Sequence, residues 1–155
     1  MTNNKPKKLE PNETQEGIIL KDIQRFGDDR GDFTNIELNE FGNFKRTYII
    51  KNTQKNVIRA FHGHNKESKL FYVPKGAFKF IIMNMETLEW KEYTLLESVP
   101  KVLFIPKGYY NGFVSLTDDS ILIVFSSSTI EESKKDDIRL PYDFLGKEVW
   151  QINHR

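Results

Sequence analysis

The stretch VIRAFHGHNKESKLFYVPKG, residues 57–76, contains the pattern that decides the fold. Two short runs rich in β-branched and aromatic residues, 57–62 and 69–73, flank a polar segment, and a Pro-Lys-Gly turn follows them. Side chains at positions i and i+2 of a strand share one face, so His62 and His64 point together, with Arg59 nearby. We therefore expect two strands with a polar cluster on a common face, which in a closed barrel is either the lumen or the solvent side.

The same pattern continues on both sides of this stretch. Eight more apolar runs are found at residues 17–23, 33–38, 44–51, 77–85, 89–96, 101–106, 112–116 and 120–125. Turn residues separate them, and no amphipathic helix of ten residues precedes position 129, which predicts an all-β sandwich or small barrel. We expect a flexible segment over 1–16, a single domain over 17–155, and short helical turns near 129–134 and 142–145 of the polar tail.

The composition restricts the class of protein. The chain has 155 residues, enough for one domain, and its 23 basic side chains nearly balance 22 acidic ones. This balance excludes the large basic excess of a nucleic-acid-binding protein. Because cysteine is absent, disulfides, thiolate zinc sites and a cysteine nucleophile are excluded too. No apolar segment matches a signal peptide or a membrane span, so we expect a cytoplasmic protein without nucleic-acid or membrane partners.

The two histidines resemble the first motif of the cupin superfamily, in which His-x-His precedes a Glu that is followed, after six residues, by Gly. Here Lys69 occupies the position of that Glu, with six residues between it and Gly76. The second cupin motif, Pro-x-Gly-x-x-His, is present as PKGYYN with Asn111 in the His position. An ammonium repels a divalent cation and an amide is a weak transition-metal ligand, so we expect a jelly-roll cavity without metal or other cofactor.

Longer segments resemble the dTDP-4-dehydrorhamnose 3,5-epimerase family. They are FGDDRGDF (26–33), NVIRAFHGH (56–64), SKL (68–70), IPKGYYNGF (105–113) and YDFLGKEVW (142–150). The run KRTYIIKNTQKNVIRAFHGHNK (45–66) is also similar to the sugar 3,4-ketoisomerases of this superfamily. The resemblance implies a jelly-roll barrel, usually a homodimer, that binds a nucleoside-diphosphate keto-sugar and serves deoxysugar or polysaccharide biosynthesis.

The resemblance also implies roles for individual residues. His62 and Lys69 match the catalytic His and Lys of the epimerases, and Tyr48 and His64 match a Tyr and a His of the ketoisomerases. The expected substrate-binding residues are Arg30 and Arg59 for the diphosphate, Phe33 for the nucleotide, and Tyr110 and Asn111 in the second motif. For Asn111, hydrogen bonding to the backbone is an alternative.

The chemistry of these groups fits a deprotonation next to a carbonyl. A neutral imidazole is a suitable base near neutral pH, and an ammonium stabilises the resulting enolate oxygen. Epimerisation then needs an acid on the opposite face of the sugar, for which Tyr48, Tyr109 and Tyr110 are candidates. A one-sided transfer through an enediol, with Tyr48 and His64, would instead give ketoisomerisation.

Two departures from the epimerase pattern keep alternatives open. The catalytic Tyr of those enzymes falls near Ile130, and the tail that carries the Asp partner of their His is not expected here. Lys134 to Asp137 are interpreted as a solvated surface run. We therefore expect a C3 and/or C5 epimerase, with a 3,4-ketoisomerase and a non-catalytic nucleotide-sugar-binding cupin as alternatives.

Overall fold

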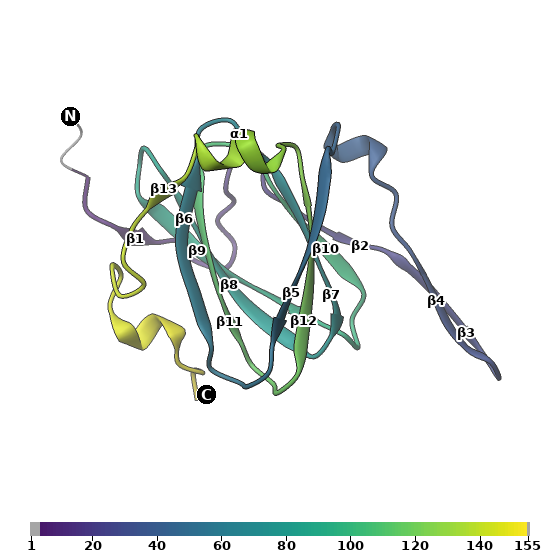
Figure 1. Cartoon of the computed structure of the whole chain (residues 1–155). Coiled ribbons are helices and arrows are strands. Elements are labelled where there is room, and N and C mark those ends of the chain that lie inside the picture. Colours follow the sequence, from purple (N-terminus) through teal and green to yellow (C-terminus); the bar gives the residue numbers. More distant parts are fainter. Residues whose placement is uncertain (1–3, 155) are drawn as a thin grey trace.

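Two β-sheets lie face to face in the computed structural model, which describes residues 4–154 (Figure 1). The first sheet has the order β1-β9-β8-β11-β6-β13, formed by β1 (Lys7–Lys8), β6 (Ile58–His64), β8 (Ala77–Asn84), β9 (Glu89–Leu96), β11 (Tyr109–Ser115) and β13 (Ile138–Arg139). The second has the order β2-β10-β7-β12-β5, formed by β2 (Ile19–Asp22), β5 (Arg46–Asn52), β7 (Lys69–Lys75), β10 (Lys101–Ile105) and β12 (Ser120–Ser126). The predicted all-β architecture is confirmed.

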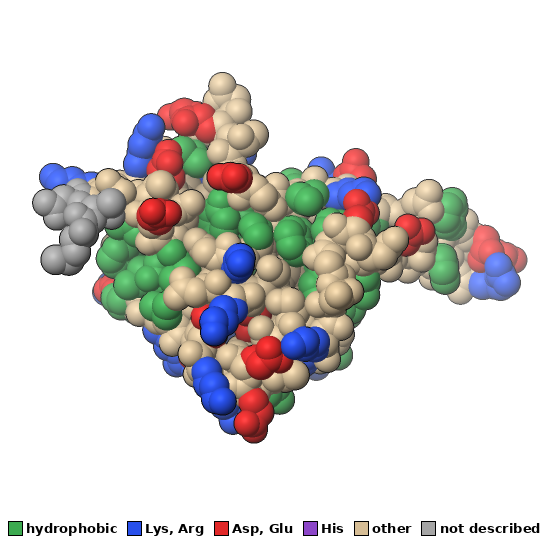
Figure 2. Space-filling model, turned by 90° about the horizontal axis from the view of Figure 1, so that it is seen from above, with side chains coloured by type: hydrophobic (Ala, Val, Ile, Leu, Met, Phe, Trp, Pro, Cys, Tyr) green, Lys and Arg blue, Asp and Glu red, His purple; other side chains and the backbone are tan. Residues whose placement is uncertain are grey.

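A two-stranded arm projects from this body. It consists of β3 (Gln24–Asp28) and β4 (Gly31–Asn35), paired antiparallel and joined to neither main sheet. Figure 2 shows the arm extending from one side of the molecule, with hydrophobic side chains along it and charged side chains at its tip. A 3-10 turn, Asn39–Phe41, then leads the chain back toward β5.

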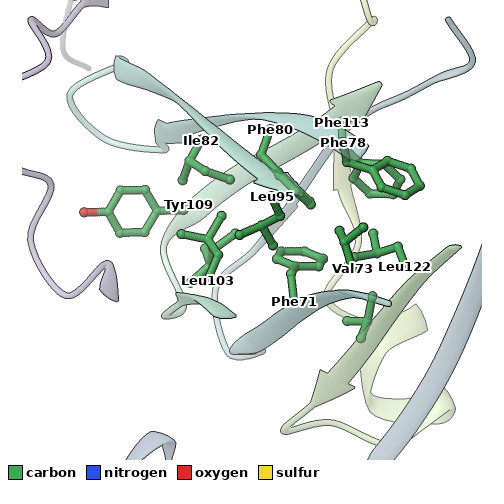
Figure 3. Close-up of a cluster of buried hydrophobic side chains, with 12 residues drawn as sticks. Phe71, Val73, Phe78, Phe80, Ile82, Leu95, Leu103, Tyr109, Phe113 and Leu122 are labelled. Carbon is green, nitrogen blue, oxygen red and sulfur yellow. The ribbon is translucent and has the colours of Figure 1, made fainter. Parts of the chain in front are cut away.

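The core lies between the two sheets (Figure 3). Alternating side chains of facing strands meet there, because every second residue of a strand points to the same side. The rings of Phe71 and Phe80 are 5.1 Å apart between centroids, and those of Phe80 and Phe113 are 5.7 Å apart. This aromatic packing fills part of the space between the sheets, and Phe113 also borders the cavity described below.

The segment after β12 crosses from one sheet to the other. Helix α1 (Ile130–Lys134) lies over one end of the barrel (Figure 1) and starts with a capping box between Thr129 and Glu132, which confirms the helical turn expected there. The chain then pairs β13 with β6. Residues 142–145 form turns rather than a helix, and a 3-10 turn follows at Lys147–Trp150.

The described part of the N-terminal segment, residues 4–16, is partly packed; the expected flexibility of residues 1–16 stays a prediction, and residues 1–3 lie outside the described residues. Strand β1 pairs parallel with β9, Leu9 is buried, and Gln15 is buried with its amide nitrogen donating to the Ile82 carbonyl. Residues 7–15 therefore pack against the first sheet, because one apolar and one amide side chain find partners there. Among residues 4–154 no helix is long and apolar enough to cross a membrane.

Candidate active site

A cavity of about 380 Å³ opens between the two sheets at the end of the aromatic core. Its lining residues are Tyr48, Ile50, Ile58, Arg59, Ala60, His62, Lys69, Asn111 and Phe113. They come from strands β5, β6, β7 and β11. The polar face predicted from the alternation in β6 is therefore the lumen side. The cavity also brings together five of the nine residues expected at the site.

His62 is paired with a carboxylate at the wall of the cavity. Its Nδ1 lies 3.3 Å from Oδ1 of Asp137, which also accepts a hydrogen bond from Arg139 at 2.9 Å through Oδ2. Partial burial lowers the pKa of His62 below its ordinary value, and the Asp137 hydrogen bond offsets this only in part. The imidazole is thus neutral near pH 7, with Nδ1 donating to Asp137 and Nε2 left as the basic nitrogen.

Strand pairing delivers Asp137 to this position. In β13, Ile138 pairs with Gly63 and Arg139 with His62, so the residue before the strand lies beside the imidazole. Burial acts to raise the pKa of Asp137, but hydrogen bonds from Arg139 and His62 outweigh it and lower that pKa. Lys134, Lys135 and Asp137 are exposed, as expected for a solvated run, but the two aspartates also make specific contacts: Asp136 accepts three backbone amides, and Asp137 is the partner of His62.

Lys69 enters the cavity from the opposite sheet, at the start of β7. Its side chain is almost fully buried, and Nζ lies 3.6 Å from Oε2 of Glu67. Burial lowers the pKa of Lys69, while the charge of Glu67 acts in the other direction. Reasoning from the sequence missed Glu67, whose side chain lies beside this lysine and has no exposed surface.

Tyr48 is the only phenol among the lining residues. It lies on β5, and Arg46 stacks over its ring at 4.8 Å. Burial and the nearby Glu67 carboxylate raise the pKa of Tyr48, against a smaller opposing effect of Arg46, so the phenol keeps its proton near neutral pH. It is placed to donate a proton into the cavity.

Arg59 and Asn111 complete the polar lining. Nε of Arg59 donates to Oδ1 of Asn52 at 3.0 Å, and this hydrogen bond restrains the orientation of the guanidinium. The amide nitrogen of Asn111 donates to the His62 carbonyl oxygen at 3.2 Å, so this side chain bonds the backbone of the neighbouring strand, the alternative considered from the sequence.

Four predicted site residues lie elsewhere in the chain. His64 is buried next to the cavity and its Nδ1 donates to the Asp136 carbonyl oxygen at 2.7 Å. Tyr110 packs on the other face of its sheet, directly on Gly63, where a Cβ would approach its ring to 2.5 Å. Arg30 and Phe33 are on the arm, where Arg30 pairs with Asp28. The role of each in substrate binding or catalysis stays a prediction.

Tyr109 and Tyr110 point to opposite faces of their sheet, because they are adjacent residues of β11. Both are buried, and the Tyr109 hydroxyl donates to the Glu16 carbonyl oxygen at 2.6 Å. Neither lines the cavity, which leaves Tyr48 as the phenol available there.

The side chains at the cavity do not fit a transition metal. The Lys69 ammonium lines the cavity where a carboxylate ligand would be needed. The amide nitrogen of Asn111 donates to the backbone. Within residues 4–154, no group of three or more His, Asp or Glu side chains is arranged to hold a metal ion.

Comparisons with known structures define the class of fold. The chain is similar to dTDP-4-dehydrorhamnose 3,5-epimerase from Bacillus anthracis, with a TM-score of 0.75 and 22% identity, covering 92% of this chain and 90% of that one. It is also similar to QdtA, a sugar 3,4-ketoisomerase from Thermoanaerobacterium thermosaccharolyticum solved with TDP, with a TM-score of 0.71 and 24% identity, covering 87% and 96%. The fold is thus the cupin barrel shared by these epimerases and ketoisomerases.

The family follows from the sequence comparison. A model of the FdtA family, described as WxcM-like, C-terminal, matches residues 16–148, and the chain belongs to this family. The spore coat polysaccharide biosynthesis protein SpsL of Bacillus subtilis is 27% identical over an alignment of 137 residues, which covers 83% of this chain and 90% of that protein. The resemblance inferred from the motifs is confirmed.

Proposed function

We propose that the protein is an epimerase that acts on a nucleoside-diphosphate 4-keto-6-deoxyhexose at the carbons next to the keto group. The observation that carries the proposal is the placement of His62 on one sheet and of Lys69 and Tyr48 on the other, around one cavity. Epimerisation needs a base and an acid on opposite faces of the sugar ring. Walls that belong to opposing sheets meet this requirement.

The reaction begins with loss of a proton. Nε2 of His62 takes the hydrogen of C3 or C5, the C–H bond breaks, and its electron pair forms an enolate with negative charge on O4. The Lys69 ammonium stabilises that oxygen, and burial strengthens the interaction. Asp137 holds the imidazole in the required tautomer and stabilises the imidazolium that forms.

The second half of the reaction returns a proton to the other face. The Tyr48 hydroxyl donates it to the carbon, the enolate collapses to the ketone, and the configuration inverts. Exchange with solvent then restores the phenol and the neutral imidazole. The raised pKa of Tyr48 supports this role, because the group is protonated before the step.

Substrate recognition rests on the charge around the cavity. Nε of Arg59 is bonded to Asn52, and the other guanidinium nitrogens can donate hydrogen bonds to phosphate oxygens. The volume of about 380 Å³ lies within the range of about 300–1,000 Å³ typical of small-molecule sites. The structural neighbours solved with TDP support a nucleoside diphosphate as the group attached to the sugar.

A homodimer would complete this site. Phe26 and Phe33 pair with each other across the arm and are 61% and 64% exposed, a large apolar surface for a two-stranded hairpin. We infer that the arm packs on a second copy, where Arg30 and Phe33 would reach the partner's substrate. Figure 2 shows the arm in a position free to do so.

A 3,4-ketoisomerase is the second candidate. The match to the FdtA family over residues 16–148 and the similarity to QdtA support it. The same base and ammonium would then move hydrogens between C3 and C4 through an enediol, with Tyr48 as the proton carrier at oxygen.

One experiment separates these functions. The protein is incubated with TDP-4-keto-6-deoxyglucose in deuterated water, and the sugar is followed by NMR. Deuterium at C3 or C5 with inverted configuration is expected for the epimerase, and a 3-keto sugar indicates the ketoisomerase. Tight TDP binding without any incorporation would refute both and favour a binding protein.

A further inference from the structure

A fully buried carboxylate lies behind the cavity, and the proposed reaction does not use it. Oε2 of Glu67 is 3.6 Å from the Lys69 ammonium and 3.7 Å from the Arg46 guanidinium, and Oε1 is 4.0 Å from Nδ1 of His64. The Glu67 side chain has no exposed surface, and neither oxygen makes a hydrogen bond within the described chain. An anion in this position is costly unless neighbouring cations compensate it.

The backbone is organised to place Glu67 there. The Asp136 carboxylate accepts the amides of Asn65, Lys66 and Glu67 at 2.9, 2.9 and 3.1 Å, which fixes the loop before β7. The next residue along the chain, Asp137, is the partner of His62. One short segment thus sets the position of the proposed base and of this carboxylate.

The charges around Lys69 show what Glu67 contributes. Lys69 and Arg46 both approach the same carboxylate oxygen, so without that anion two cations would share a buried site. Arginine does not lose its proton in proteins, and lysine does so readily when buried. The repulsion would therefore be relieved at Lys69, which would become a neutral amine.

We propose that Glu67 is a positioning residue of the site: its carboxylate keeps the Lys69 side chain in the ammonium form and directed at the cavity. The catalytic role of Glu67 rests on the proposed function, since only a charged Lys69 stabilises an enolate. The charge state of Lys69 can be measured without any turnover of substrate.

The pH dependence involves all groups that face Lys69. Burial lowers the pKa of Lys69 and the charge of Glu67 acts to raise it, so loss of Glu67 should lower that pKa further. The other titratable or charged groups around it are Arg46 and Tyr48 on β5, His62 and His64 on β6, and Asp137 before β13.

The first test is an NMR titration of Lys69 in protein labelled with ¹³C-lysine, with the signal assigned by its absence in Lys69→Arg. Glu67→Gln should move the Lys69 midpoint to lower pH. The matched control is Glu92→Gln, which removes the carboxylate 3.2 Å from another buried lysine, Lys79, away from the cavity, and should leave the Lys69 midpoint in place. An unchanged midpoint in Glu67→Gln overturns the proposal.

A second variant keeps the test decisive if Glu67→Gln fails to fold. Arg46→Gln removes the competing cation and retains Glu67, so the Lys69 midpoint should rise. A midpoint that falls or stays constant in this variant contradicts the proposed balance of charges.

Activity supplies the final readout. Glu67→Gln should lower kcat with little change in KM, lowering the pH should restore part of the rate, and Glu67→Asp should retain more activity than Glu67→Gln. A wild-type protein without isomerase activity but with the expected Lys69 shift would refute the proposed function alone. An active enzyme in which Glu67→Gln leaves both the Lys69 midpoint and the pH profile unchanged would refute the role of Glu67 alone.

Discussion

Asp137→Asn removes the negative charge beside the proposed base and keeps the size of the side chain. At 3.3 Å the charge interaction with an imidazolium is about 1.3 kcal/mol under full water screening and about 5 kcal/mol at an effective dielectric constant of 20. The side chains of His62 and Asp137 are 34% and 25% exposed, so the screened value applies. A loss of about 1.3 kcal/mol corresponds to a roughly tenfold lower kcat, and the loss of the carboxylate charge also lowers the pKa of His62.

The direction of the pH effect is the sharper part of this prediction. The reaction needs the neutral imidazole, so the wild-type rate falls on the acidic side as pH drops through the His62 pKa, which burial already places below its ordinary value. Asp137→Asn should move this acidic limb to still lower pH while the plateau decreases. The assay is the rate of deuterium incorporation between pH 4.5 and 8, with Asp22→Asn, an exposed ion-pair residue near Lys101, as the control. An acidic limb that stays in place or moves upward would refute the assigned partnership.

Three other changes probe the site and the arm. Lys69→Met should lower kcat by about 10²–10³-fold, because the enolate loses its cation. The TDP affinity of this variant, measured by calorimetry, should stay within a few fold of wild type. A near-normal kcat would contradict the role of the ammonium. Tyr48→Phe should retain solvent exchange at the carbon that His62 deprotonates. In an NMR assay the same variant should lower the yield of inverted sugar by about 10²-fold or more. Equal loss of exchange and inversion would argue against an acid role for Tyr48. Phe26→Ser combined with Phe33→Ser should convert a dimer to a monomer in sedimentation velocity, and a persistent dimer would remove the arm from the interface.

The fold was predictable because its signals are local. Period-two runs with β-branched and aromatic residues mark the strands, and the turn residues between them mark their ends. The expectation that His62 and His64 share a face also followed from strand geometry alone. Which face this is, and which other strands meet it, depends on how the barrel closes.

The parts of the site that escaped prediction depend on pairings between distant segments. Asp137 is 75 positions from His62 and reaches it only because β13 pairs with β6. Glu67 follows a polar loop and resembles a surface residue until the Asp136 carboxylate folds that loop inward. Arg30 was expected to bind the diphosphate or to pair with Asp28 or Asp32 in a turn; it does pair with Asp28, but its position on a projecting arm is a property of the tertiary structure.

The most direct test of the central claim compares wild-type protein with His62→Asn in deuterated water. The claim is that His62 and Lys69, from opposing sheets, act on one carbonyl-activated sugar in a common cavity. With TDP-4-keto-6-deoxyglucose, the wild-type protein should introduce deuterium at a carbon next to the keto group, and His62→Asn should lose this exchange while it still binds TDP. Undiminished exchange in His62→Asn, or no exchange by a wild-type protein that binds the sugar nucleotide, would contradict the account.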